Sequence, residues 1–116
     1  MTSIQDRLRA LKEALVTVSN DCWHYDAPSD KHVPYIVWYE DKEDNPLNLD
    51  NHKVRQSISG YVHYYTLTEF DPAFDSIQEA LDSIEGCSWS WETTQNGDPT
   101  QNDNNIIQYT WSWRLR

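Results

Sequence analysis

Two aromatic runs near the C-terminus constrain the fold of this chain most strongly, because apolar and polar residues alternate strictly along both. In 87–92 (Cys-Ser-Trp-Ser-Trp-Glu) the cysteine and both tryptophans fall on one face, and 107–115 (Ile-Gln-Tyr-Thr-Trp-Ser-Trp-Arg-Leu) repeats the pattern. A period of two is typical of β-strands with one buried and one solvated face. A polar loop, 95–105, joins the runs, so we expect an antiparallel hairpin with four inward tryptophans.

Two other segments have the period of a helix. Between Ile4 and Val18 apolar residues recur every three or four positions, and Thr2 or Ser3 can cap the N-terminus. A second apolar stripe runs through 74–84, after an Asp-Pro pair that is typical of a helix start and before a glycine that suits its end. We therefore expect two amphipathic helices.

The remaining strands are expected between the two helices. The run 35–39 is β-branched and aromatic throughout, and the charged run 40–46 should end it. The stretch 54–67 predicts one long strand, bent at Gly60. Residues 20–33 are expected to be irregular. Leu47 and Leu49 could form a short pairing of their own, whereas Asn48, Asp50 and Asn51 favour a loop.

The order helix, strand, strand, helix, strand, strand predicts an α+β fold. In such folds helices pack across the apolar face of an antiparallel sheet, here four-stranded with two helices on one face. A chain of 116 residues has room for one core, so 1–116 is expected to be a single α+β domain.

One face of the predicted long strand is richer in aromatic rings than a solvated surface requires. Tyr61, His63 and Tyr65 alternate with Val62 and Tyr64, which belong to the opposite face. Exposed aromatic side chains that cluster indicate a contact surface. We therefore expect this face to meet a covering loop or a neighbouring chain.

A run of carboxylates after the first strand is the second candidate for a contact. Most such runs are solvated turns, and this one lacks the regular ligand spacing of a calcium loop. If it has a function, it is an acidic rim that faces a partner. Its acidic members are Glu40, Asp41, Glu43 and Asp44.

No pattern in the sequence indicates catalysis, a metal or a cofactor. The four histidines and two cysteines lack the paired spacing of zinc ligands, and three glycines argue against most phosphate-binding loops. Ser59 and His63 are four positions apart, about 13 Å along a strand, which is too far for a nucleophile and its base. The tryptophans alternate as a core face does, which favours a core over a sugar-binding platform.

The charge balance excludes several classes of partner. Nine Lys and Arg against 19 Asp and Glu give a formal charge of −10, which opposes binding to nucleic acid or to an anionic membrane. The sequence contains no apolar run of membrane-spanning length and no recognisable secretory signal. With two cysteines, a reducing intracellular setting is the expectation.

The layout resembles that of a known group of virus proteins. An amphipathic helix precedes a Pro-Tyr-Ile-Val-Trp-Tyr strand (34–39), and Gly-Tyr-Val-His-Tyr-Tyr-Thr (60–66) leads through Asp-Pro-Ala-Phe (71–74) into the second helix. Over 4–116 the chain resembles the small tail-terminator or tail-completion proteins of long-tailed, non-contractile bacteriophages and prophage remnants. Its Trp-Ser-Trp hairpin replaces the more strongly charged hairpin of that group.

This resemblance implies a non-enzymatic virion component, assembled in the bacterial cytoplasm. Members form a ring, typically six-fold, that caps the tail tube and offers a surface to the head connector. The implied partners are other copies of the chain, the tube protein and the connector, with no cofactor and no catalytic residues to carry over.

Two other functions stay open from the sequence. The charge of −10 motivates an acidic decoy that mimics nucleic acid and inhibits a host DNA-binding protein, although lysines and arginines interrupt the carboxylates. The tryptophans motivate a module that binds a sugar or another small molecule.

Overall fold

The computed structural model describes residues 3–29, 32–43, 47–49, 52–55, 57–96 and 106–116. Its elements, in chain order, are α1 (Ile4–Val18), β1 (Cys22–His24), β2 (Tyr35–Glu43), β3 (Leu47–Leu49), β4 (His52–Arg55), β5 (Ile58–Thr66), α2 (Ala73–Asp82), β6 (Cys87–Asn96) and β7 (Ile107–Leu115). The expected α+β class and both helices are confirmed. No described helix is long and apolar enough to cross a bilayer.

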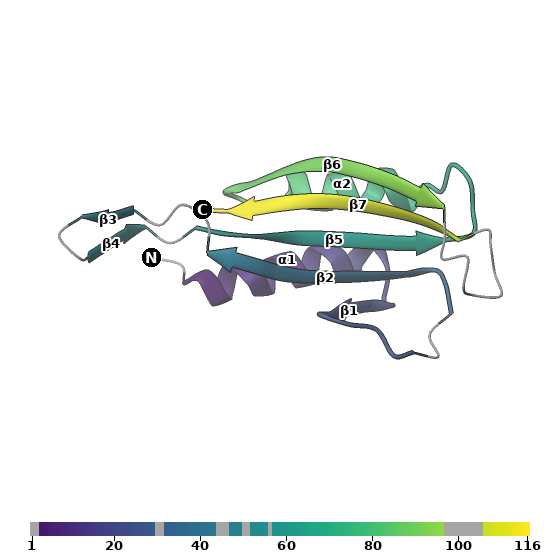
Figure 1. The fold of residues 1–116 in the computed structure, drawn as a ribbon, viewed down its shortest axis with the longest axis horizontal. Helices are drawn as coiled ribbons and strands as arrows, with labels where there is room; N and C mark the ends of the chain where they lie inside the picture. Colours follow the sequence, from purple (N-terminus) through teal and green to yellow (C-terminus); the bar gives the residue numbers. More distant parts are fainter. Residues whose placement is uncertain (1–2, 30–31, 44–46, 50–51, 56, 97–105) are drawn as a thin grey trace.

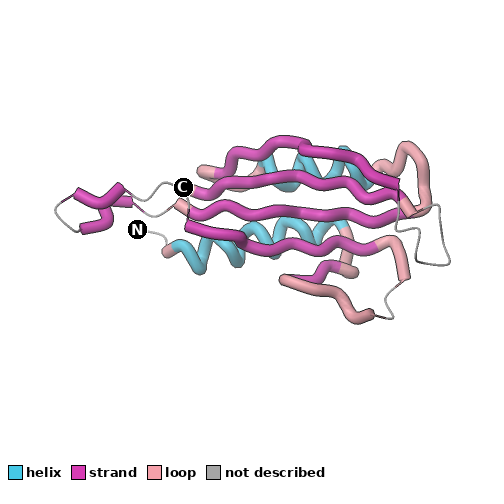
Figure 2. The backbone as a smooth tube through the Cα atoms, in the orientation of Figure 1, coloured by secondary structure: helices cyan, strands magenta, loops and turns pink. Residues whose placement is uncertain are grey.

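The main sheet has five strands in the order β1-β2-β5-β7-β6. The last four pair antiparallel, as expected, whereas β1 pairs parallel to β2. Both helices lie against the same face of this sheet (Figures 1 and 2). The sheet is therefore mixed and five-stranded, and the prediction of a four-stranded antiparallel sheet was wrong.

The extra strand β1 comes from the segment that was expected to be irregular. Its three residues pair with Ile36, Val37 and Trp38 of β2. Three residues are too few to show an alternation in sequence, and their strand conformation comes from hydrogen bonds to β2. Only the tertiary structure brings that partner strand alongside.

Two strand boundaries also differ from expectation. β2 continues through the charged run to Glu43, with an irregular register between Glu40 and Lys42 that is typical of a β-bulge. The expected single strand 54–67 is divided into β4 and β5, because β4 pairs with β3 in a separate two-stranded sheet. The segment 47–49 is thus a strand and not a loop.

The β3–β4 hairpin projects beyond one end of the main sheet (Figure 1). It contributes to an elongated outline of 54 × 26 × 23 Å. A two-stranded hairpin by itself is only marginally stable in water. The hairpin is therefore the part of the fold with the least support from the core.

The core lies between the main sheet and the two helices. Leu11 and Leu15 of α1 and Ile77 and Leu81 of α2 are fully buried, and they pack with β-strand residues in one cluster. The cluster also includes Ile36, Trp38, Val62, Tyr64, Ile84, Trp111, Trp113 and Leu115. The expected apolar stripes therefore face the sheet, as amphipathic helices do.

The four hairpin tryptophans are buried to very different degrees. Trp111 and Trp113 on β7 are 0% and 2% exposed, whereas Trp91 on β6 is 51% exposed and Trp89 is half-buried. β7 has a strand on each side, and β6 is the edge of the sheet. The expectation that all four fill the core is correct for the inner strand and wrong for Trp91.

Asp71 connects the end of β5 to the start of α2. One carboxylate oxygen accepts from the backbone N–H of Ala73 at 2.9 Å, and the other accepts from the Tyr64 and Thr66 hydroxyls at 2.8 and 2.7 Å. Burial by itself would raise the pKa of Asp71, but these hydrogen bonds outweigh it, and the pKa is lowered from its ordinary value. The Asp71 side chain thus accepts the backbone N–H of the first residue of α2, at the helix start that the Asp-Pro pair predicts.

This lowered pKa predicts an acid-sensitive contribution to stability. Because the folded-state pKa lies below the unfolded-state value, the stabilisation is complete above the unfolded pKa and is lost as pH falls through the folded pKa. Urea unfolding between pH 7 and pH 2 should show a shallower decline for Asp71→Asn than for the wild type. Parallel declines for the two proteins would contradict the assignment.

Candidate functional site

Neither α1 nor α2 covers the opposite face of the main sheet (Figures 1 and 2), and we call that face the outward face. Paired residues on neighbouring strands share a face, so the register defines its members. They are Trp23 of β1; Tyr35, Val37, Tyr39 and Lys42 of β2; Ser59, Tyr61, His63 and Tyr65 of β5; Gln108, Thr110, Ser112 and Arg114 of β7; and Ser88, Ser90, Thr93 and Gln95 of β6. One half is aromatic, and the other is rich in serine.

The aromatic half includes the three side chains that the sequence singled out. His63 lies between Tyr61 and Tyr65, with ring centroids 6.3 Å from each. Two tyrosines of β2 extend this group, because Tyr35 stacks on Tyr65 at 4.8 Å and Tyr39 lies 5.8 Å from Tyr61. We call these five residues the aromatic cluster. The alternation along β5 predicted three of its five members, Tyr61, His63 and Tyr65. The other two join the cluster because β2 pairs with β5.

His63 is held in place by hydrogen bonds on both ring nitrogens. Its Nδ1 lies 3.2 Å from the amide nitrogen of Gln108 and 2.9 Å from the Thr110 hydroxyl, while Nε2 lies 3.1 Å from the Tyr39 hydroxyl. The Gln108 amide donates, so Nδ1 accepts and Nε2 carries the proton. Burial lowers the pKa of His63, which keeps the ring neutral at pH 7.

Burial also raises the pKa of three tyrosines of the cluster, Tyr35, Tyr39 and Tyr65, so these three are neutral at physiological pH. Burial, followed by the neighbouring Tyr35, Tyr39 and Asp26, raises the pKa of Tyr65 to about 12. The cluster is therefore an uncharged surface of rings and hydroxyls, the composition that interface centres favour.

A loop lies next to part of the aromatic cluster. Residues 25–29 and the rings of Tyr35, Tyr39, His63 and Tyr65 together line a cavity of about 390 Å³. This loop therefore borders part of the aromatic cluster, and Tyr61 is outside the cavity that the loop lines.

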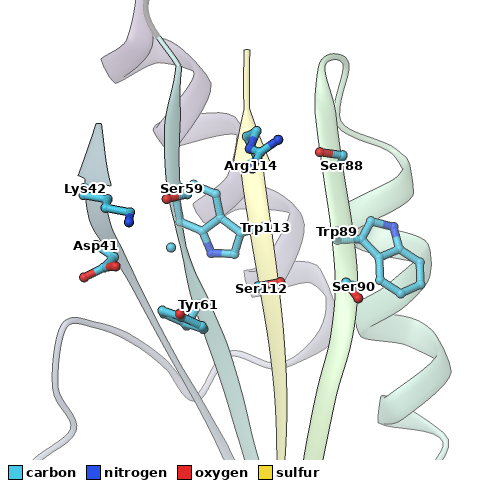
Figure 3. A pocket seen from close by; sticks show the side chains of 11 residues that line it. Asp41, Lys42, Ser59, Tyr61, Ser88, Trp89, Ser90, Ser112, Trp113 and Arg114 are labelled. Carbon is cyan, nitrogen blue, oxygen red and sulfur yellow. The ribbon is translucent and has the colours of Figure 1, made fainter. Parts of the chain in front are cut away.

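The serine-rich half forms a second depression of about 400 Å³ (Figure 3). Asp41 and Lys42, successive residues at the irregular register of β2, both line it, together with Tyr61 and Arg114. A bulge allows this because it interrupts the strict alternation of side chains between the two faces. The other outward side chains that line it are Ser59, Ser88, Ser90 and Ser112.

The acidic residues that the sequence grouped together are separated by the structure. Asp41 lines the serine-rich depression. Glu40 does not line it and instead contacts His24 and Tyr25. Glu43 is half-buried at the end of β2, and Asp44 lies outside the described residues. Glu40 and Asp41 thus do not form one acidic rim.

The contacts of Glu40 form a cluster that the sequence did not indicate. Its carboxylate lies 2.6 Å from His24 Nε2 and accepts from the Tyr25 hydroxyl. The His24 ring stacks between Trp38 and Tyr25, with centroids 3.9 Å from each. Burial would raise the pKa of Glu40, but the hydrogen bonds from Tyr25 and His24 outweigh it and lower the pKa. Tyr25 reaches Glu40 from a left-handed backbone (φ 75°), which no local pattern predicts.

The described residues offer no evident site for a metal. Among them, no three His, Cys, Asp or Glu side chains converge on one point. Cys22 and Cys87 are both free, and burial raises the pKa of each thiol to about 11. Both thiols are therefore protonated at neutral pH, and a protonated thiol is a poor nucleophile and a poor metal ligand.

No protein-family model matches this sequence, and no curated protein matches it either. The function is therefore proposed from the outward face, the fold and the resemblance in layout.

Proposed function

We propose that this chain is a non-enzymatic assembly protein of a long-tailed bacteriophage or prophage. In this proposal it forms a ring, six-fold as in the proteins it resembles, that ends the tail tube and joins it to the head connector. It works as a component of the virion that is assembled in the bacterial cytoplasm. The outward face is the single observation that carries the proposal.

The chemistry of the outward face suits a contact with another protein. The aromatic cluster is neutral and half-buried, and its His63 is fixed by Tyr39 and Thr110. Rings that are already ordered lose little conformational entropy when a partner covers them. Asp41, Lys42 and Arg114 lie beside the rings and supply charges of both signs at the rim.

Two backbone features support the same function. β6 is a ten-residue edge strand, so one side of it is not paired within the main sheet. The β3–β4 hairpin reaches beyond that sheet (Figure 1). Unpaired edges and weakly supported hairpins are features that a neighbouring chain can complete.

The proposal predicts that one aromatic side chain controls assembly. Tyr61 is partly exposed at the junction of the aromatic and serine-rich halves, so Tyr61→Asp should leave the fold intact and weaken partner binding by about 30-fold or more. Negative-stain microscopy would count capped ends on tubes assembled from the tube protein encoded in the same phage or prophage genome. Glu79→Ala, at an exposed position of α2 and outside the outward face, is the control.

Two results would contradict the proposal. One is a wild-type protein that leaves tube length and tube ends unchanged. The other is binding to a basic DNA-processing enzyme that weakens steeply with added salt, as an acidic decoy requires.

A further inference from the structure

Phe70 is the most exposed large apolar side chain among the described residues. It is 88% exposed, in the loop between β5 and α2. Its backbone is left-handed, with φ 57°, a conformation that bulky residues rarely adopt and that costs conformational energy. Neither burial nor local geometry therefore favours phenylalanine here, and strain of this kind concentrates at functional positions.

The loop around Phe70 is anchored on both sides. The backbone N–H of Thr68 donates to the Thr66 hydroxyl at 3.1 Å, and the backbone N–H of Phe74 donates to the Asp71 carbonyl at 3.0 Å. Asp71 itself binds two hydroxyls of β5. Phe70 thus belongs to an ordered turn, and the connection between β5 and α2 that contains it lies at the end of the sheet opposite the β3–β4 hairpin (Figure 1).

A hollow of matching chemistry lies elsewhere on the same chain, beside the first half of α1. We call it the α1 hollow; its volume is about 320 Å³. It is lined by Gln5, Leu8, Arg9 and Lys12 of α1, His24 and Tyr25, and Trp38 and Glu40 of β2. It thus combines a leucine and stacked aromatic rings with two cationic side chains of α1.

We propose that Phe70 of one copy of this chain inserts into the α1 hollow of a second copy. This inference rests on the proposed function, since it names the contact that joins successive subunits. The hollow is open to solvent, and its volume of about 320 Å³ leaves room for a benzyl group. The ring would exchange a position that is 88% exposed for contact with the half-buried Leu8 and the exposed ring of Tyr25.

Lys12 gives the hollow a cation that can meet the carboxylate beside Phe70. Glu69 precedes Phe70 in the chain, and Lys12 lines the hollow with Arg9 and with the carboxylate of Glu40, while Arg9 pairs with Asp6 at 3.2 Å. A chain with a net charge of −10 repels its own copies at most orientations. An approach that places carboxylates of one copy against the cations of another is therefore favoured.

The geometry of this contact also suits a ring. The two surfaces lie on different parts of the chain, so the contact is heterologous, with one patch meeting a different patch on the next copy. Such contacts repeat from copy to copy and produce a ring when the rotation closes.

Phe70→Gly separates this function from folding. Glycine accepts a positive φ, so the midpoint of thermal unfolding should stay equal or rise. Self-association, measured by sedimentation velocity over a concentration series, should weaken by about 30-fold or more. Glu79→Ala, at an exposed position in the second half of α2, should associate like the wild type.

A mixing experiment tests the pairing of the two surfaces. The double variant Arg9→Glu, Lys12→Glu reverses the charges of the hollow but keeps Phe70, and alone it should be monomeric. Mixed with Phe70→Gly, it should form dimers and nothing larger, because each mixed pair has one intact contact. The added negative charge could also prevent association by general repulsion. Such repulsion would oppose the mixed dimer as well, so a mixed dimer would show that the specific contact forms.

The outcomes distinguish this inference from the function on which it rests. A Phe70→Gly protein that assembles like the wild type, or a mixture without dimers, overturns the inference and leaves tail assembly standing. A wild type that is monomeric at every concentration also overturns the inference. If that monomer fails to cap tail tubes, the proposed function falls with it.

Discussion

Replacing Trp111 by alanine is expected to lower the free energy of unfolding by about 4 kcal/mol. Trp111 is 0% exposed, it packs with the ring of Phe74 at 5.1 Å, and its indole N–H donates to the Gln78 side chain at 3.2 Å. Alanine would leave a large cavity between the sheet and α2, and the core could collapse only partly into it. Domains of this size have a total stability of about 5–15 kcal/mol, so the variant should lose a large part of it and unfold at a clearly lower urea concentration.

Trp91→Ala is the matched control for this prediction. Trp91 lies directly opposite Trp111 in the β6–β7 register, but it is 51% exposed, and its ring contacts Phe74 edge-on at 5.7 Å. Its loss should cost about 1 kcal/mol. Urea unfolding followed by circular dichroism measures both variants, and equal costs at the two positions would contradict the assignment of core and edge.

Replacing Gly60 by alanine is expected to cost about 3 kcal/mol, although it adds one methyl group. The new Cβ would lie 2.5 Å from Cζ2 of Trp113 and 2.8 Å from Cα of Glu40, and it would overlap the carbonyl oxygen of Tyr39. Two of these three neighbours are backbone atoms of β2, which cannot move without shifting its pairing with β5. The midpoint of thermal unfolding should fall by about 10 °C or more.

Ser59→Ala is the control for the glycine substitution. Ser59 is the preceding residue of β5 and lines the open depression on the outward face, so its substitution should change stability by less than about 0.5 kcal/mol. Wild-type stability in the Gly60→Ala protein would show that the crowding around this position is relieved by a small backbone shift. The role assigned to the glycine would then be wrong.

The candidate site could be predicted only in part from the sequence. Alternation along β5 placed Tyr61, His63 and Tyr65 on one face, because the side chains of a strand point alternately to its two sides. The same rule could not add Tyr35 and Tyr39, whose contribution depends on the pairing of β2 with β5. Grouping Glu40 with Asp41 was misleading, because adjacent strand residues point to opposite sides and Glu40 binds His24 and Tyr25.

The sequence by itself determined the two helices, the closing hairpin and the α+β class. Each of these follows from a periodic pattern within a single segment, and such a pattern fixes which side chains share a face. Only the tertiary structure decided that β1 joins the sheet, that Trp111 is buried where Trp91 is exposed, and that Phe70 protrudes. The physical reason is that burial depends on a strand's neighbours in the sheet, and those neighbours are brought together by contacts between residues far apart in the chain.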